Sequence, residues 1–242
     1  MKSQQRENRP LGGRPKRPKR SQLRAVRSGR PPRAVAGEVE ARILDAARRA
    51  FLDRGLAGAS VDEIAELARA GKPTIYARFP SKEALFAAVL MHNVSVNIAR
   101  FQAHEPIGAT IEERLASVGN AVLHWALTED MVGLMRLVIA EAGRFPDLAN
   151  SFDRMARERG NEAVARLLVE AAKSDRLAKL PAFAPKHRQT TTRMFLDLVF
   201  LPLMMRALLG EKLKPLRAEI APHVARTVTF FLAACRLGGL KS

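Results

Sequence analysis

The stretch ARAGKPTIYARF, residues 68–79, gathers side chains that donate hydrogen bonds and carry positive charge. Lys72, Thr74, Tyr76 and Arg78 supply an ammonium, a hydroxyl, a phenol and a guanidinium within a short segment. Groups of these kinds bind phosphate oxygens and reach base edges, so the chemistry that they suggest is recognition of a nucleic acid. Whether they can act together depends on the helices that position them.

Two predicted helices precede this stretch. From Glu38 apolar residues recur at three- and four-residue steps, which predicts a first helix that ends at Gly55. Ser60, followed three residues later by Glu63, has the pattern of a capping box and predicts a second helix over 61–68. The break between the two helices is therefore only a few residues long.

The third predicted helix contains the stretch itself. Gly71 can cap it, and Pro73 is accepted in its first turn because the amide there has no partner within the helix. Pro80 disfavours helical geometry just before it and limits this helix to about two turns. Ser81 caps a fourth helix that runs towards Phe101.

The second and third helices can close a small apolar core, which leaves the polar side chains outside. The predicted core residues are Ile64, Ala65, Ala68, Ile75 and Phe79. Two short helices joined by a turn, with a polar and cationic outer side, form a helix-turn-helix that lays its second helix in the DNA major groove. The predicted DNA-contacting residues are Ser60, Arg69, Lys72, Pro73, Thr74, Tyr76, Arg78 and Lys82.

Residues 38–90 strongly resemble the DNA-binding domain of TetR-family transcriptional regulators. The pattern of that family is a first helix ending in Phe and Gly, a capped second helix, T-[IL]-Y-x-x-F and then x-K-x-x-L. Its counterparts here are Phe51, Gly55, residues 60–68, TIYARF at 74–79 and KEAL at 82–85. The resemblance implies a regulator, in most such families a repressor, that binds double-stranded DNA.

Three residues depart from the family pattern. Arg69 stands where the turn often has glycine, and a side chain in a left-handed conformation costs about 1 kcal/mol, so either the turn differs here or Arg69 contributes a phosphate contact. Gly71 replaces the usual serine cap, and Pro73 occupies a position that often faces DNA. The base specificity of relatives therefore does not transfer to this chain, and the operator sequence is left open.

The rest of the chain predicts five more helices and no strand. Their expected ranges are 110–128, 130–143, 147–174, 188–209 and 216–236, separated by breaks that contain Pro or Gly. The fold class is thus all-α, with a DNA-binding domain over 38–84 and a larger helical domain over 85–242. The segment at 131–152 looks like the ligand-binding half of the AefR-like subgroup.

The resemblance also implies a homodimer, formed through the last two long helices and suited to a pseudo-palindromic operator. Apolar residues on both helices agree with a dimer interface: Phe195, Leu198, Val199, Met205, Val224, Val228, Phe231 and Leu232. Two recognition helices about 34 Å apart would match successive major grooves.

Small-molecule response is a further property that the resemblance implies, with an effector that is small and largely apolar. Residues that could line its pocket are Phe101, Trp125, Met131, Met135, Phe145, Phe152 and Met155. Each of them could equally be an ordinary core residue. Arg136, Glu141 and Asp197 could anchor a polar end of the effector, or could pair with one another.

Charge is concentrated at the start of the chain. Of the formal charge of +17, residues 1–37 hold twelve cations against one acid, whereas residues 38–90 hold eight of each. We expect residues 1–37 to form a disordered arm for a polyanion, with Arg14, Lys16, Arg17 and Arg30 as DNA contacts. The arm could read the minor groove of A·T-rich DNA through its Gly-Arg-Pro pieces, bind phosphates without specificity, or have no partner.

Other classes of function find little support in the sequence. No catalytic motif, phosphate loop or metal-ligand spacing is present, so neither an enzyme nor a cofactor or metal is expected. The single Cys235 and the absence of a long apolar run favour a cytoplasmic protein without a membrane segment. The main alternative is a DNA-architectural protein that binds through its basic arm; a helical enzyme is a remote one.

Overall fold

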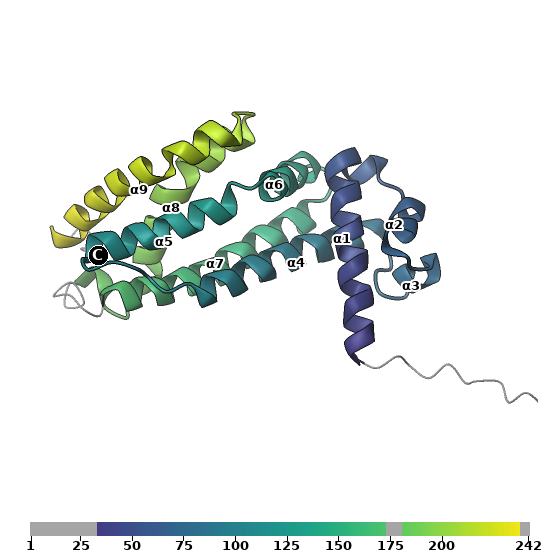
Figure 1. The fold of residues 1–242 in the computed structure, drawn as a ribbon, viewed down its shortest axis with the longest axis horizontal. Helices are drawn as coiled ribbons and strands as arrows, with labels where there is room; N and C mark the ends of the chain where they lie inside the picture. Colours follow the sequence, from purple (N-terminus) through teal and green to yellow (C-terminus); the bar gives the residue numbers. More distant parts are fainter. Residues whose placement is uncertain (1–32, 173–180, 238–242) are drawn as a thin grey trace, which may run out of the picture.

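The protein is described here by a computed structural model that covers residues 33–172 and 181–237. Within these ranges it is helical and contains no strand, which confirms the all-α prediction. The elements are α1 (Arg33–Gly58), α2 (Val61–Ala68), α3 (Lys72–Tyr76), α4 (Lys82–Ala103), α5 (Ile111–Ala126), α6 (Glu129–Glu141), α7 (Pro146–Ala172), η2 (Pro181–Phe183), α8 (Arg188–Leu208) and α9 (Leu213–Arg236). Figure 1 shows an elongated molecule with α1 to α3 at one end and α8 and α9 at the other.

Two hydrophobic clusters form the core. The N-terminal cluster holds the first four helices together, and the C-terminal cluster joins the later helices. Phe51 of α1 and Phe86 of α4 meet edge to face with ring centroids 5.2 Å apart, and both are fully buried. The predicted core of the two short helices is also buried: Ile64, Ala65, Ala68, Ile75 and Phe79. Each large apolar side chain removed from water contributes about 1.5–3 kcal/mol, so this cluster can stabilise the small helices that could not exist alone.

The later helices lie within three residues of their predicted bounds, with α9 starting at Leu213 instead of 216, and the larger differences concern α1 and the domain division. Helix α1 begins at Arg33, so residues 33–37, predicted to belong to the basic arm, are helical. Its regular part does end near Gly55 as predicted, where the backbone turns to φ 70° and ψ 175°. The predicted division after residue 84 falls inside α4, which is continuous and contributes Leu85 to the N-terminal cluster.

Helix α4 links the two halves of the molecule. In the described part of the chain it is the one helix long and apolar enough to cross a membrane. Its apolar side chains at Phe86, Val89 and Leu90 instead belong to the N-terminal cluster, and Phe101 near its other end packs on the C-terminal cluster. Packing against both clusters accounts for part of the apolar composition of α4, whereas Met91 and Val96 are exposed.

The C-terminal cluster joins α5, α7, α8 and α9, and α5 lies directly against α9 (Figure 1). This contact is close because Gly119 of α5 has no side chain: a β-carbon there would lie 2.8 Å from Cγ1 of Val224. Phe195 of α8 and Phe231 of α9 complete this core with ring centroids 5.1 Å apart.

The turn between α2 and α3 depends on one strained residue. Arg69 adopts φ 49° and ψ 46°, so the turn keeps the left-handed geometry that glycine favours, although the sequence had left open that the turn differs here. Its amide donates to the carbonyl of Glu66, and the amide of Ala70 donates to Ala65 at 2.9 Å. These bonds end α2 and redirect the chain into α3, so the geometry of the helix-turn-helix is obtained despite the strain at Arg69.

Two helical glycines provide a test of the α5 to α9 contact. Gly160 of α7 has open space around it, so Gly160→Ala should stabilise the protein by up to about 1 kcal/mol through helix propensity. Gly119→Ala should destabilise it by about 1–3 kcal/mol, because the new methyl group meets the stiff side chain of Val224. Urea unfolding followed by circular dichroism measures the free energy of unfolding of each variant. If Gly119→Ala stabilised the protein as much as Gly160→Ala does, the close packing of α5 against α9 would be wrong.

Replacing Arg69 tests the strain in the turn. Arg69→Gly should raise the free energy of unfolding by about 0.5–1 kcal/mol, because glycine adopts the left-handed conformation without a steric cost. The matched variant Arg69→Ala removes the guanidinium but keeps the β-carbon, and should show no such gain. If both variants gained alike, the effect would belong to the charge and not to the backbone.

Candidate nucleic-acid interface

Helix α2 begins at Ser60, whose hydroxyl accepts a hydrogen bond from the amide of Asp62 at 3.2 Å. Ser60 is therefore the predicted cap. Its expected capping-box partner, Glu63, instead forms an ion pair with Arg54 of α1 at 2.9 Å, so the second half of that prediction is wrong. The carboxylate turns to α1 because a full positive charge attracts it more strongly than a neutral amide.

Helix α3 presents a polar surface because its apolar side is used for packing. Ile75 is buried, whereas Pro73 and Tyr76 are exposed, with Tyr76 49% accessible. Thr74 is half-buried, and its carbonyl accepts a hydrogen bond from the guanidinium of Arg78 at 3.2 Å. The structure thus places the predicted reader side chains on and just after one short helix.

Two cations of the predicted interface already have partners. Lys72 forms an ion pair with Asp62 of α2. The ammonium of Lys82 donates to the carbonyls of Ala57 and Ala59 at 2.9 and 3.2 Å, and so holds the end of α1 against the start of α4. Arg69 is exposed and has no side-chain hydrogen bond or ion pair to another described residue. These pairings were not predicted, because each joins residues that lie well apart along the chain.

The predicted arm residues Arg14, Lys16, Arg17 and Arg30 lie outside the described residues. The described part of the interface therefore comes from residues 38–90, whose formal charge is zero. Strong attraction to a polyanion needs an excess of positive charge, which this chain holds in residues 1–37.

The predicted pocket residues are divided between the two hydrophobic clusters. Phe101 and Met135 pack on the C-terminal cluster, whereas Phe145 and Phe152 pack on the N-terminal one. A hollow of about 330 Å³ opens elsewhere and is lined by Asp153, Arg154, Arg157, Glu158, Asn161, Gln189 and Arg193. Two of the predicted pocket residues are in direct contact: Phe101 meets Trp125 edge to face with ring centroids 4.3 Å apart.

The ionisable residues predicted on apolar helices do not pair with one another. Arg136 donates to the carbonyls of Ala207 and Leu208 at 2.5 and 3.2 Å, where it satisfies the C-terminal end of α8. Glu141 instead pairs with Arg144, and Asp197 pairs with Arg193. Mutual pairing, one of the two alternatives for these residues, is therefore wrong. Arg136 is held by the last carbonyls of α8, and Glu141 and Asp197 each pair with an arginine three or four residues away in the sequence.

Six of the eight predicted dimer residues are buried within the protomer. They are Phe195, Val199, Val224, Val228, Phe231 and Leu232. Their side chains fill the space between α5, α8 and α9, so they cannot also form a surface for a second copy. Leu198 is half-buried and Met205 is 52% accessible, so these two remain on the outer side of α8.

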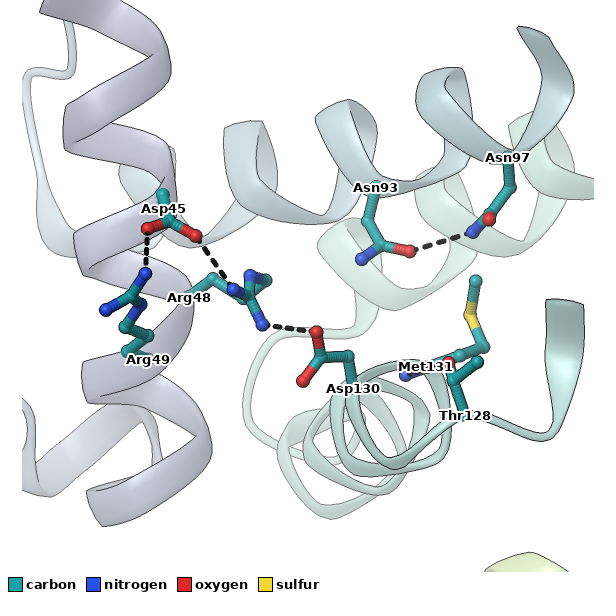
Figure 2. Close-up of polar contacts among 8 residues, drawn as sticks. All are labelled: Asp45, Arg48, Arg49, Asn93, Asn97, Thr128, Asp130 and Met131. Carbon is teal, nitrogen blue, oxygen red and sulfur yellow. Dashed lines mark hydrogen bonds and ion pairs between the residues drawn. The ribbon is translucent and has the colours of Figure 1, made fainter. Parts of the chain in front are cut away.

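A junction between α1 and α6 was not predicted. Arg48 of α1 lies between Asp45, at 2.7 Å, and Asp130 of α6, while Arg49 also binds Asp45 (Figure 2). The hydrogen bond from Arg48 is the main cause of the lowered pKa of Asp45, with the charge of Arg49 adding to it against a partial opposing effect of burial.

The same junction is closely packed beside this ion pair. A β-carbon on Gly133 of α6 would lie 2.6 Å from Cδ2 of Leu52, and Leu134 is buried in the N-terminal cluster. A glycine within an apolar helix was the one sequence signal for such close approach. Helices α1 and α6 are therefore joined both by an ion pair and by apolar contact.

Two family descriptions match the chain. Residues 43–89 match "Bacterial regulatory proteins, tetR family", and residues 113–236 match "AefR-like transcriptional repressor, C-terminal domain". The transcriptional repressor Rv3405c of Mycobacterium tuberculosis is 30% identical over 135 residues, which is 56% of this chain and 68% of that protein. Curated relatives of higher identity match a short segment only, and the chain spans about a quarter of their length.

Solved structures share this fold over most of the chain. A TetR-family regulator from Mesorhizobium loti is 24% identical with a TM-score of 0.70, and the match covers 82% of this chain and 97% of that one. The Flavonoid-responsive Regulator FrrA is 32% identical with a TM-score of 0.58 over the same shares. The helix-turn-helix geometry, the helical C-terminal half and these matches agree: the chain belongs to the TetR family of bacterial transcriptional regulators, with a C-terminal domain of the AefR-like type.

Proposed function

We propose that the protein is a ligand-responsive repressor that binds a pseudo-palindromic operator as a homodimer in the cytoplasm. The observation that supports this most directly is helix α3, which is buried on one side through Ile75 and exposes Pro73 and Tyr76 on the other. A short helix supported in this way can enter the major groove and bring its first residues to the base edges.

Within this proposal the exposed groups have separate tasks. Thr74 and Pro73 offer apolar contact and a hydroxyl to bases, and Tyr76 offers its hydroxyl to phosphate over a flat ring. Lys72, Arg69 and Arg78 supply positive charge, while Ser60 and Lys82 lie at the starts of α2 and α4, where helix amides favour anions. Residues 1–37 add affinity through Arg14, Lys16, Arg17 and Arg30.

The dimer would form through the outer faces of α8 and α9. Met194, Leu198, Leu201 and Met205 recur at four- and three-residue steps, so they form one stripe on α8. Phe230 of α9 is 65% accessible, which is unusual for a side chain of this size. Such contiguous apolar surface supports association with a second copy.

A small, largely apolar effector would bind between α4, α5 and α6, where Phe101, Trp125 and Met135 lie. Met131 of α6 points towards α4, whose Asn97 donates to Asn93 at 3.0 Å and could meet a polar group of the effector (Figure 2). The name of FrrA as flavonoid-responsive supports an effector of this kind. The α1 to α6 junction would transmit the movement of α6 to the helix-turn-helix.

Selection from a random pool of DNA tests the operator proposal. The full chain and a chain shortened to start at Arg33 should enrich the same two-fold-symmetric site, because both contain the complete α1 to α3 unit. The full chain should bind more tightly and lose affinity more steeply with salt, with a slope that grows by about 0.9 for each phosphate neutralised.

Tyr76→Ala in the full chain serves as the control, since it should fold normally and lose the enrichment. Retention of DNA without any enriched site, lost when residues 1–32 are removed, would instead support an architectural protein that binds through its basic arm. If neither the full chain nor the chain that starts at Arg33 enriched a site, the proposal that the protein is a sequence-specific regulator would be wrong.

Charged substitutions on the outer face test the dimer. Leu201→Glu combined with Phe230→Glu should convert the protein to a folded monomer, because burying two carboxylates against a partner costs several kcal/mol. Light scattering after size exclusion reports the mass, which should fall by half. Ile139→Glu, a change at an exposed apolar residue of α6, is the matched control and should leave the mass unchanged; an unaltered mass in the double variant would exclude this interface.

A further inference from the structure

Asp62 and Lys72 face each other across the helix-turn-helix. Asp62 lies in the first turn of α2, and Lys72 is the first residue of α3. Their side chains form an ion pair, and both remain at least half exposed to solvent. The pair therefore sits at the point where the start of the recognition helix approaches the preceding helix, within the surface proposed to meet DNA.

A carboxylate at this place works against DNA binding in two ways. Its negative charge repels a phosphate that approaches Ser60 and the exposed amides at the start of α2. It also neutralises Lys72. Residues 61–79 contain only two other cations, Arg69 and Arg78. No tertiary packing requires Asp62, because its side chain is exposed.

We propose that Asp62 is a positioning residue that holds the Lys72 ammonium beside α2 in the free protein, and that a DNA phosphate replaces the carboxylate on binding. The inference rests on the proposed function, because it assumes that α3 enters the major groove. An exposed ion pair is weak, so phosphate can displace Asp62 without a large penalty. Asp62 thereby lowers affinity for all DNA alike and leaves discrimination to the contacts that Thr74 and Tyr76 make with bases.

Asp62→Asn tests this exchange with little change in shape. Fluorescence anisotropy at about 0.1 M salt, with the selected operator and with a mixed-sequence duplex of about 30 base pairs, should show binding about three- to tenfold tighter for both. The ratio between the two affinities should stay constant. Asp53→Asn is the matched control, since Asp53 is also an exposed carboxylate paired with an arginine, Arg54, at 3.4 Å, but lies on α1.

A double-variant cycle with Lys72→Met separates positioning from plain repulsion. If Asp62 acts by holding Lys72, the gain from Asp62→Asn should fall to less than half when Lys72 is absent. An equal gain in both backgrounds, or a gain of the same size from Asp53→Asn, would overturn the proposal. Unfolding curves for each variant show whether a loss of stability contributes.

The outcomes also separate this inference from the proposed function. If the unaltered protein binds the selected operator and Asp62→Asn binds it no more tightly, the ion-pair exchange is wrong while the regulator stands. If the unaltered protein selects no site from the random pool, the proposed function itself fails, whatever its affinity for the mixed-sequence duplex.

Discussion

The edge-to-face contact between Phe51 and Phe86 is the interaction on which the rest of the arrangement depends. It fixes α1 to α4, and α2 and α3 are too short to persist without the core that these two helices provide. Because α4 continues for 22 residues to the C-terminal cluster, it spans about 33 Å as one rigid element. The orientation of the helix-turn-helix is thereby coupled to packing at the far end of the molecule.

The junction of α6 with α1 gives the two halves a second connection. Gly133 leaves room for the end of the Leu52 side chain, and Arg48 joins Asp45 and Asp130 across the same boundary. This contact brings α6 beside α1, and within the proposed function it would let a shift of α6 reach the helix-turn-helix.

Electrostatics in this protein are divided between two parts of the chain. The helix-turn-helix segment is neutral, and two of its cations, Lys72 and Lys82, are engaged by a carboxylate and by backbone carbonyls. Its geometry can discriminate between sequences, but its net charge cannot concentrate it on DNA. The excess of positive charge lies instead in residues 1–37, and within the proposed function these residues would supply the sequence-independent attraction.

Local signals allowed much of the fold to be predicted. Ser60 and Ser81 mark helix starts, and Pro80 limits the third helix to a short segment. These features are decided within a few residues by caps, backbone restrictions and helical periodicity, so the sequence by itself determined the helices, the helix-turn-helix and its buried core.

Only the tertiary structure decided what each helix packs against. Periodicity shows that α8 and α9 are apolar, but not which apolar face lies inside; Phe195 and Val228 are in the core, and Met205 is outside. The pairs Arg48 with Asp130 and Lys72 with Asp62 likewise join different helices. Helical propensity is a property of neighbouring residues, whereas the partner of a face or a charge depends on how whole helices assemble, and no local signal contains that information.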